Sequence, residues 1–263
     1  SLTGKTGISL PGESGSIWWP RSVFCNSENF SQLAAASFGQ TFNITPLQLI
    51  TAVSACCNGG YLMKPYIVDS VTDGTGALIS KTEPEVLRQV ISEKTSAQVN
   101  AVLEQVVCDT KQGTGKNAYV AGYHIAGKTG TSEKIDEYDE NGKPVDDKIV
   151  SFIGVAPIDD PKYVVLVALD TPNYVAGTSY TPHNQYISGG LMAAPTVREL
   201  VGNGIALTDG AVGNGLVGKQ LCGLVLRHAD HIAKRNVDAP DVVGGVIRLH
   251  AEIRQNIEEH IAH

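Results

Sequence analysis

The stretch YVAGYHIAGKTGTS, residues 119–132, has the pattern of a β-strand and is the first of three in succession. KIVSFIGVAP, residues 148–157, and YVVLVALD, residues 163–170, follow with the short apolar runs typical of strands. Asn141-Gly142 interrupts the first connection, and Asp159-Asp160-Pro161 forms a turn in the second. Because both connections are short, we expect the three strands to pair as an antiparallel meander.

Helix signals lie on both sides of these strands. The clearest is Thr45-Pro46-Leu47-Gln48, in which a capping threonine, a proline at the first helical position and a glutamine form a capping box. Apolar residues then recur at helical spacing until Asn58-Gly59-Gly60 ends the helix. Further helices are predicted over about Ser92–Cys108 and Ala194–Val201, whereas residues 1–44 are predicted to be mostly loop. The fold class predicted is α/β (α+β), an antiparallel sheet packed against helices.

The carboxy-terminal part of the chain has a different character. From about Gly202 onward glycines crowd the sequence. Beyond them lie two helical patterns, near Lys219–Arg235 and Val246–Ala262. We therefore divide the chain into a main domain, residues 1–201, and a glycine-rich linker with a helical tail, residues 202–263.

Composition excludes several function classes. Of the 263 residues, 42% are hydrophobic, which is enough for a sizeable core. The net charge is -7, so the chain lacks the basic surface typical of a nucleic-acid-binding protein. The longest clean apolar run, Tyr163–Leu169, is far shorter than the roughly 20 residues that span a bilayer. Ser1-Leu2-Thr3-Gly4 has no feature of a signal peptide and resembles the middle of a longer protein. The five cysteines include no C-x-x-C pair, so a disulfide framework is not expected.

A nucleotide-binding motif occurs in the first predicted strand. Residues 122–129, GYHIAGKT, fit the P-loop pattern G-x-x-x-x-G-K-[ST]. A P-loop needs a glycine-rich loop that leads into a helix, whose first amides bind the phosphates. Here the interior of the motif, Tyr-His-Ile, favours a strand, and an acidic loop follows. P-loop NTPase is therefore the weakest of the functions that we consider.

Two further patterns fail to indicate a cofactor or a metal. Gly213-Asn214-Gly215-Leu216-Val217-Gly218 fits the dinucleotide fingerprint G-x-G-x-x-G, but too little chain follows it for a nucleotide-binding domain. Five of the seven histidines lie in the tail, and no cysteine or carboxylate completes a ligand set with them. We expect neither a cofactor nor a metal site.

The tip of the first strand, Lys128-Thr129-Gly130-Thr131, can carry chemistry. In an ideal strand Lys128 and Gly130 face one way, while Thr129 and Thr131 face the other. A cation can then support a catalytic network while two hydroxyls bind a substrate carboxylate, and Gly130 lets a substrate peptide lie close. If the strand is a sheet edge, a substrate can pair with it and a backbone amide can serve an oxyanion hole. The second K-T-G, Lys5-Thr6-Gly7, is interpreted as structural.

The region from Lys5 to about Leu200 resembles the carboxy-terminal half of the transpeptidase domain of class B penicillin-binding proteins, which are membrane-anchored bacterial cell-wall enzymes. The resemblance rests on blocks that follow one another in the family's order, namely Lys5-Thr6-Gly7-Ile8, Leu10-Pro11-Gly12-Glu13, Ser37-Phe38-Gly39-Gln40, Thr45-Pro46-Leu47-Gln48, Asn58-Gly59-Gly60, Pro65, Gly113-Thr114-Gly115, Ala126–Ser132, Ser188-Gly189-Gly190 and Ala194-Pro195.

The resemblance implies a peptidoglycan D,D-transpeptidase at the extracytoplasmic face of the cell membrane. In that family the serine of an S-x-x-K motif is acylated by a stem peptide ending in D-Ala-D-Ala, or by a β-lactam. By resemblance, Lys128 holds the catalytic network together, and Thr129 and Thr131 bind the terminal carboxylate. The strand that includes Gly130 binds the substrate, and the amide of Thr131 supplies half of the oxyanion hole. Other cell-wall synthesis proteins are the expected partners.

The chain departs from the family because S-x-x-K does not occur in it; the nearest approach is Thr131-Ser132-Glu133-Lys134. Ser27-Glu28-Asn29 spells S-x-N, but it follows the Leu10–Glu13 block, whereas the family's S-x-N precedes that block. We interpret it as a coincidence. The nucleophile, its base, two further strands and the membrane anchor are therefore expected in a missing amino-terminal half, which leaves a sheet edge exposed. The alternative is a catalytically incompetent fragment or pseudoenzyme that acts only as a binding module.

Overall fold

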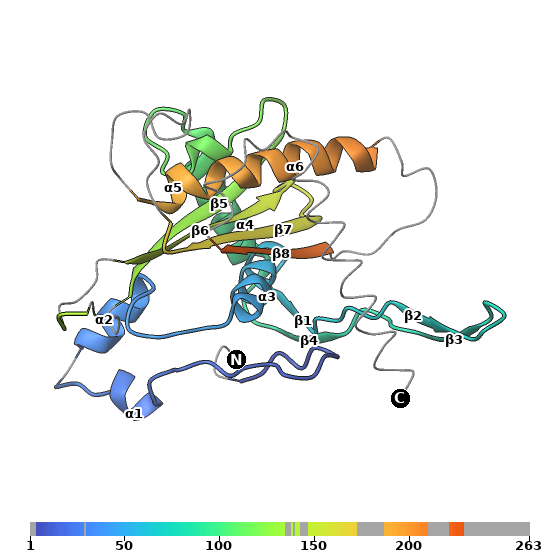
Figure 1. Ribbon diagram of the computed structural model, residues 1–263, viewed down its shortest axis with the longest axis horizontal. Helices are drawn as coiled ribbons and strands as arrows, with labels where there is room; N and C mark the ends of the chain where they lie inside the picture. Colours follow the sequence, from blue (N-terminus) through green and yellow to red (C-terminus); the bar gives the residue numbers. More distant parts are fainter. Residues whose placement is uncertain are drawn as a thin grey trace.

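The three predicted strands form one sheet in the computed structural model of the chain (Figure 1). β5 (Ala126–Glu133), β6 (Lys148–Ala156) and β7 (Tyr163–Asp170) pair as an antiparallel meander, with an unbroken register along both interfaces. β8 (Leu221–His228) lies parallel beside β7, so the strand order is β5-β6-β7-β8. The predicted meander and the α/β (α+β) fold class are confirmed. The structure describes residues 4–28, 30–134, 138, 140–142, 147–172, 187–209 and 221–228.

The helices predicted after Thr45, after Ser92 and from Ala194 are present, and the first two begin at side-chain caps. α3 (Pro46–Cys57) begins with the expected capping box, in which Gln48 N donates to Thr45 Oγ1 over 3.2 Å and Thr45 N donates to Gln48 Oε1 over 2.8 Å. α4 (Glu93–Cys108) is capped by Ser92. The other helices are α1 (Arg21–Phe24), α2 (Ser31–Ser37), the 3-10 turn η1 (Lys116–Ala118), α5 (Gly189–Met192) and α6 (Ala194–Asp209). Within the described residues, no helix combines the length and the hydropathy that crossing a bilayer requires.

Helices cover the sheet on both faces, with α6 on one side and α3 on the other (Figure 1). We call these sides the α6 face and the α3 face. Each has its own apolar cluster because successive strand residues point to opposite faces. The α6 face packs Val107, Ala118, Val150, Phe152, Val167, Leu169, Val197 and Val201. The α3 face packs Ile50, Cys57, Ala126, Ile153, Val155, Ile158, Val164 and Leu166.

Three expectations about element boundaries are wrong. The strand predicted from Tyr119 begins only at Ala126, because the chain turns at Gly122, whose φ is +84°. The helix predicted to end at Val201 continues to Asp209. Part of the helix predicted near Lys219–Arg235 is instead strand β8, since its backbone pairs with β7. The division of the chain at residue 202 stays a prediction, and the second tail helix lies outside the described residues.

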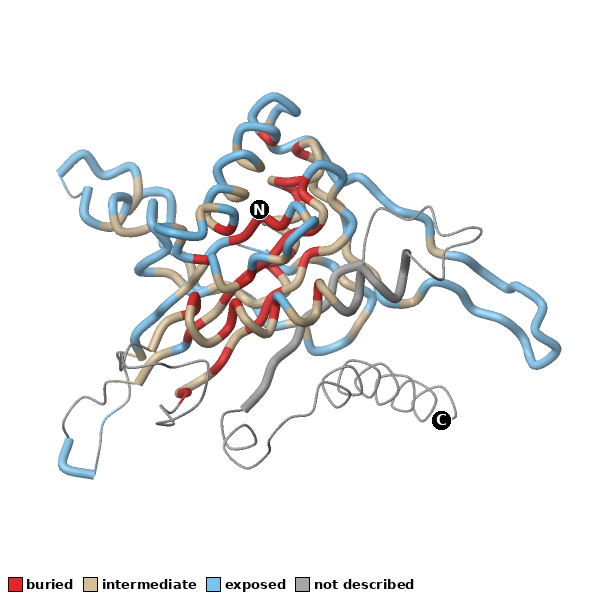
Figure 2. Tube along the Cα trace, turned by 90° about the horizontal axis from the view of Figure 1, so that it is seen from above, coloured by how far each residue is buried: buried red, intermediate tan, exposed pale blue. Residues whose placement is uncertain are grey.

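Two outlying parts of the chain contain no buried residue among those described (Figure 2). One is the arm made by β2 (Ser70–Thr72) and β3 (Leu78–Lys81). In the chain this arm lies between β1 (Tyr61–Met63) and β4 (Val86–Gln89), which pair as a small sheet. The other is the segment of α1 and α2, in which neither helix has a buried residue. Its internal packing comes from Trp18, whose ring contacts those of Phe24 and Phe42. The buried residues therefore concentrate on the main sheet and the helices beside it.

Candidate active site

Strand β5, which carries the Lys128–Thr131 motif, is the outer strand of the main sheet. It pairs with β6 on one side, and no strand among the described residues pairs with its other side. The condition that this strand be a sheet edge is therefore met in the described part of the molecule. An open edge offers unpaired backbone groups to another extended chain.

The side chains of the motif alternate between the two faces as predicted. Lys128 pairs with Ile153, which belongs to the α3-face cluster, whereas Thr129 pairs with Phe152 of the α6-face cluster. Directly paired residues share a face of the sheet. Lys128 and Gly130 therefore lie on the α3 face, and Thr129 and Thr131 lie on the α6 face. Lys128 and Thr131 are exposed, while Thr129 and Gly130 are half-buried.

The direction of each backbone group in β5 follows from one hydrogen bond at its end. Lys134 N donates to Asp147 O over 2.9 Å, which makes these two residues a hydrogen-bonded pair of the antiparallel ladder. Such pairs alternate along a ladder with pairs whose N–H and C=O groups point away from the partner strand. Since the register is unbroken from Ala126 to Glu133, Thr129 and Thr131 fall in the second kind of pair. Their N–H and C=O groups point to the open edge.

The Lys128 ammonium lies along this edge. Its Nζ donates to the carbonyl oxygen of Thr129 over 2.8 Å, which is consistent with that carbonyl pointing away from β6. The Lys128 side chain is exposed, so its charge is accessible from the α3 face. A cation, an exposed hydroxyl on Thr131 and outward amides thus lie on one short stretch of strand.

Glycines allow the backbone behind β5 to approach closely. A Cβ on Gly189 would lie 1.9 Å from Ser151 O and 2.6 Å from Gly130 O, and one on Gly190 would lie 2.2 Å from Thr114 O. The G-T-G block, the K-T-G-T block and the S-G-G block are far apart in sequence, yet they pack together here. This packing, which holds β5 from the α6 face, explains Gly189 and Gly190, whereas a Cβ on Gly130 would instead meet Ser151 Oγ at 2.4 Å.

Sequence reasoning missed two side chains that support this arrangement. Asn117 Nδ2 donates to Gly190 O over 2.8 Å, which ties η1 to the start of α5. Lys134 Nζ lies 2.6 Å from Asp170 Oδ1 and so links the end of β5 to the end of β7. Neither pair has a periodic or motif signal, because the partners are distant in the sequence.

The second K-T-G has a structural role, as interpreted from the sequence. Lys5-Thr6-Gly7 lies in a loop that Glu13 closes, because the Glu13 carboxylate accepts from Thr6 N over 2.5 Å and from Gly7 N over 3.1 Å. Gln48 Nε2 donates to Gly4 O over 2.7 Å, which fastens the loop to α3. The L-P-G-E block is thereby explained.

The Glu13 loop makes a prediction about acid. Desolvation alone would raise the pKa of Glu13, but hydrogen bonds from Thr6 and Gly7, with Lys5 nearby, hold that pKa below its ordinary value. A lowered carboxyl pKa stabilises the folded loop above the unfolded-state value of about 4.3, and this contribution is lost as the pH falls through the lower folded value. We expect the NMR amide signals of Thr6 and Gly7 to titrate together, with a midpoint below the unfolded-state value of about 4.3. In Glu13→Gln they should not titrate, and a midpoint at or above 4.3 would contradict the loop geometry.

The P-loop interpretation is wrong for this fold. Lys128 and Thr129 lie inside strand β5, whereas the corresponding residues of a P-loop open a helix. The dinucleotide-like glycines at 213–218 lie outside the described residues. Asn29 of the S-x-N triplet also lies outside the described residues, and so do the tail histidines other than His228. For His228 the structure describes the backbone alone.

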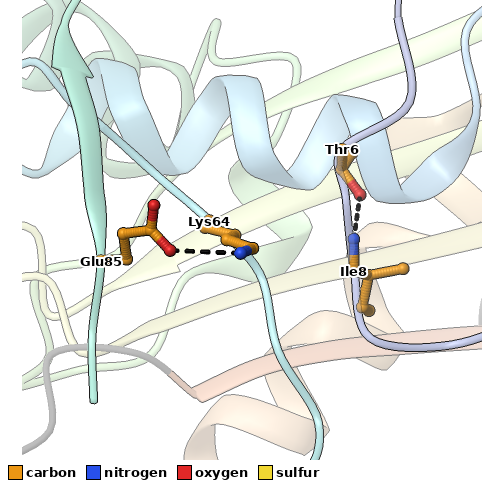
Figure 3. A network of polar contacts seen from close by, with 4 residues as sticks. All are labelled: Thr6, Ile8, Lys64 and Glu85. Atoms are coloured by element: carbon orange, nitrogen blue, oxygen red, sulfur yellow. Dashed lines mark hydrogen bonds and ion pairs between the residues drawn. The ribbon is translucent and has the colours of Figure 1, made fainter. Parts of the chain in front are cut away.

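Two cavities in the described part of the molecule lie away from β5. One of about 160 Å³ lies between the amino-terminal loop and the small sheet, where Lys64 Nζ is 3.2 Å from Glu85 Oε2 (Figure 3). Another is lined by Trp18, Trp19, Arg21 and their neighbours in the α1 segment. The candidate site is thus an open strand edge, which requires a second wall to enclose a substrate.

Comparison with known proteins agrees with this geometry. Residues 2–189 match the family described as the penicillin binding protein transpeptidase domain. Stage V sporulation protein D of Bacillus subtilis is 44% identical over 202 residues, which cover 75% of this chain and 28% of that protein. The penicillin-binding protein PbpB of Mycolicibacterium smegmatis is 35% identical over 180 residues, covering 66% of this chain and 27% of that one. The chain thus spans less than a third of the length of these relatives.

A solved structure shares the fold. The crystal structure of penicillin-binding protein 3 from Mycobacterium tuberculosis in complex with aztreonam superposes with a TM-score of 0.63 at 28% identity. The superposition covers 84% of this chain and 47% of that one. The family match extends over most of the chain and includes β5, the G-T-G block and the Glu13 loop. The chain therefore belongs to the transpeptidase domain family of class B penicillin-binding proteins.

Proposed function

We propose that this chain supplies the substrate-binding strand of a peptidoglycan D,D-transpeptidase. The observation that carries the proposal is the open edge of β5, to which Thr129 and Thr131 direct their N–H and C=O groups. An extended peptide can add to such an edge as a further strand. A stem peptide that ends in D-Ala-D-Ala is short and extended, and it carries a terminal carboxylate that suits the exposed hydroxyl of Thr131.

The proposed chemistry is acyl transfer through a serine ester. A serine oxygen attacks the carbonyl carbon between the two D-alanines, the peptide bond breaks, and the terminal D-alanine leaves with a proton on its new amine. The Thr131 N–H donates to the oxygen that becomes negative during this attack. The Lys128 ammonium stabilises the network of proton-transferring groups from the α3 face. The serine itself lies outside these 263 residues, which contain no S-x-x-K.

Partners and location follow from the same proposal. The aztreonam complex of the Mycobacterium tuberculosis relative supports β-lactams as ligands. The relative from Caulobacter vibrioides that is named a probable peptidoglycan D,D-transpeptidase supports a cell-wall context. We place the whole protein at the extracytoplasmic face of the membrane, attached through a segment outside this chain, and working with other cell-wall synthesis proteins.

The missing S-x-x-K also favours a second candidate, a fragment or pseudoenzyme that binds muropeptide or a partner protein without reacting. Labelling with a fluorescent penicillin separates the two. We expect no covalent adduct on residues 1–263 alone, because no activated serine is present. We expect a stoichiometric adduct on the complete protein that the gene encodes, with prior incubation in unlabelled penicillin as the control. An unlabelled complete protein would overturn the transpeptidase proposal and leave the binding module.

A further inference from the structure

The ion pair of Lys134 and Asp170 spans three strands of the sheet at one end. Lys134 is the first residue after β5, and its Nζ lies 2.6 Å from Oδ1 of Asp170, the last residue of β7. β6 lies between these two strands. The Lys134 side chain is 17% exposed and that of Asp170 is 43% exposed. The pair is therefore shielded on the lysine side from solvent.

The surroundings of Asp170 fix the carboxylate. Thr171 N donates to Lys148 O over 2.9 Å, and Thr171 Oγ1 donates to Asp170 Oδ1 over 3.0 Å. Thr171 has a φ of +48°, a left-handed conformation that is uncommon for a residue with a branched side chain. The chain thus turns sharply just after Asp170, while β7 remains bonded to β6. The Asp170 carboxylate, which pairs with the Lys134 ammonium, is therefore held in place by the inner strands of the sheet.

Strand β5 lies at an edge of the sheet and therefore needs such a restraint more than the inner strands β6 and β7 do. Within the described residues it has a partner strand on one side, and a ladder bond from Lys134 N to Asp147 O follows its end at Glu133. The end of an edge strand opens more readily than the middle of a sheet. Lys134 has the same strand parity as Lys128 and Gly130, so the ion pair lies on the α3 face. The ion pair thus restrains the carboxy-terminal end of β5, which is the part of this strand expected to open first.

We infer that Lys134 is a positioning residue which, through Asp170, holds the carboxy-terminal half of β5 and thereby fixes the outward amide of Thr131. The fixing of the strand follows from the ion pair alone. That the fixed amide serves substrate acylation rests on the proposed function. The two parts are separable by experiment, because strand opening and acylation have independent readouts.

Hydrogen exchange of the β5 amides in this chain tests the first part. Lys134→Met removes the charge and keeps the length, and we expect exchange at Gly130 and Ser132 to accelerate roughly tenfold, between the effects of exposed and buried ion pairs. Lys134→Arg should restore slow exchange. Lys64→Met is the matched control, because Lys64 and Glu85 form an ion pair whose side chains are 46% and 56% exposed on the small sheet (Figure 3). It should leave β5 unchanged.

A double-variant comparison guards against simple misfolding. Asp170→Asn alone should open β5 as Lys134→Met does, while the two changes together should cost less than their sum. A charge exchange, Lys134→Asp with Asp170→Lys, should recover part of the protection. Unchanged exchange in β5 would overturn the inference. So would acceleration that is equal in β5, β6 and β7, since that would mean a general loss of stability.

Acylation of the complete protein by penicillin tests the second part. We expect Lys134→Met to lower the acylation rate at saturating penicillin roughly tenfold, with a smaller change in the concentration that gives half-saturation, and Lys134→Arg to rescue the rate. If the acylation rate at saturation fell and the half-saturation concentration rose by equal factors, the positioning role would be overturned. If instead Lys128→Ala leaves acylation intact, the proposed function fails while the exchange result for Lys134 stands.

Discussion

Replacing Lys128 with alanine in the complete protein is expected to slow penicillin acylation by roughly 10²–10³-fold, the effect of removing one preorganised electrostatic group from an acyl-transfer site. The Lys128 ammonium lies on the α3 face at the open edge of β5, with Nζ bonded to the Thr129 carbonyl. Its side chain is exposed, so alanine leaves no cavity and the fold is expected to survive. The time course of fluorescent-penicillin labelling measures the change.

The second K-T-G provides the matched control for Lys128. Lys5→Ala changes the same residue type in the same three-letter motif, but Lys5 lies in the loop closed by Glu13 and not on the sheet edge. We expect Lys5→Ala to be acylated at nearly the wild-type rate. Equal losses in the two variants, or a Lys128→Ala protein that reacts normally, would contradict the assignment of the site to β5.

Much of this fold is predictable from the sequence because its signals are local. The start of α3 is encoded within four residues, 45–48, and the structure contains both hydrogen bonds of that capping box. The meander follows from short connections between apolar runs. The boundary at Ala126 was missed because the strand-like residues before it include Gly122, which turns the chain. Strand β8 was missed because parallel pairing with β7 depends on a partner distant in the sequence.

For the candidate site too, local spacing is predictable from the sequence, whereas contacts between distant residues are not. A period of two places Lys128 and Thr131 on opposite faces, and the paired residues Ile153 and Val150 confirm this. What holds β5 in place is contributed by other elements, through the Asn117 bond to Gly190 and the ion pair of Lys134. Such contacts join residues with no shared spacing, so only the folded chain reveals them.

Replacing Gly189 with alanine is expected to destabilise the fold by about 3 kcal/mol or more, the cost of overpacking against atoms that cannot move aside. The added methyl group would lie 1.9 Å from Ser151 O and 2.6 Å from Gly130 O, both backbone atoms. Alanine favours a helix over glycine by about 1 kcal/mol, which is too little to offset this clash at the start of α5. The expected fall in melting temperature is roughly 6–12 °C.

Gly74→Ala is the matched control for Gly189→Ala. Gly74 lies at the tip of the β2–β3 arm, and a Cβ there meets nothing within 4 Å, so its melting temperature should stay close to that of the wild type. The clash at Gly189 falls on Gly130, so any relaxation of α5 away from the sheet would also release β5 within the Lys128–Thr131 motif. Stability and penicillin acylation are therefore expected to fall together in Gly189→Ala. If Gly189→Ala had the same melting temperature as the Gly74→Ala control, α5 would not pack on the backbone of β5 and β6.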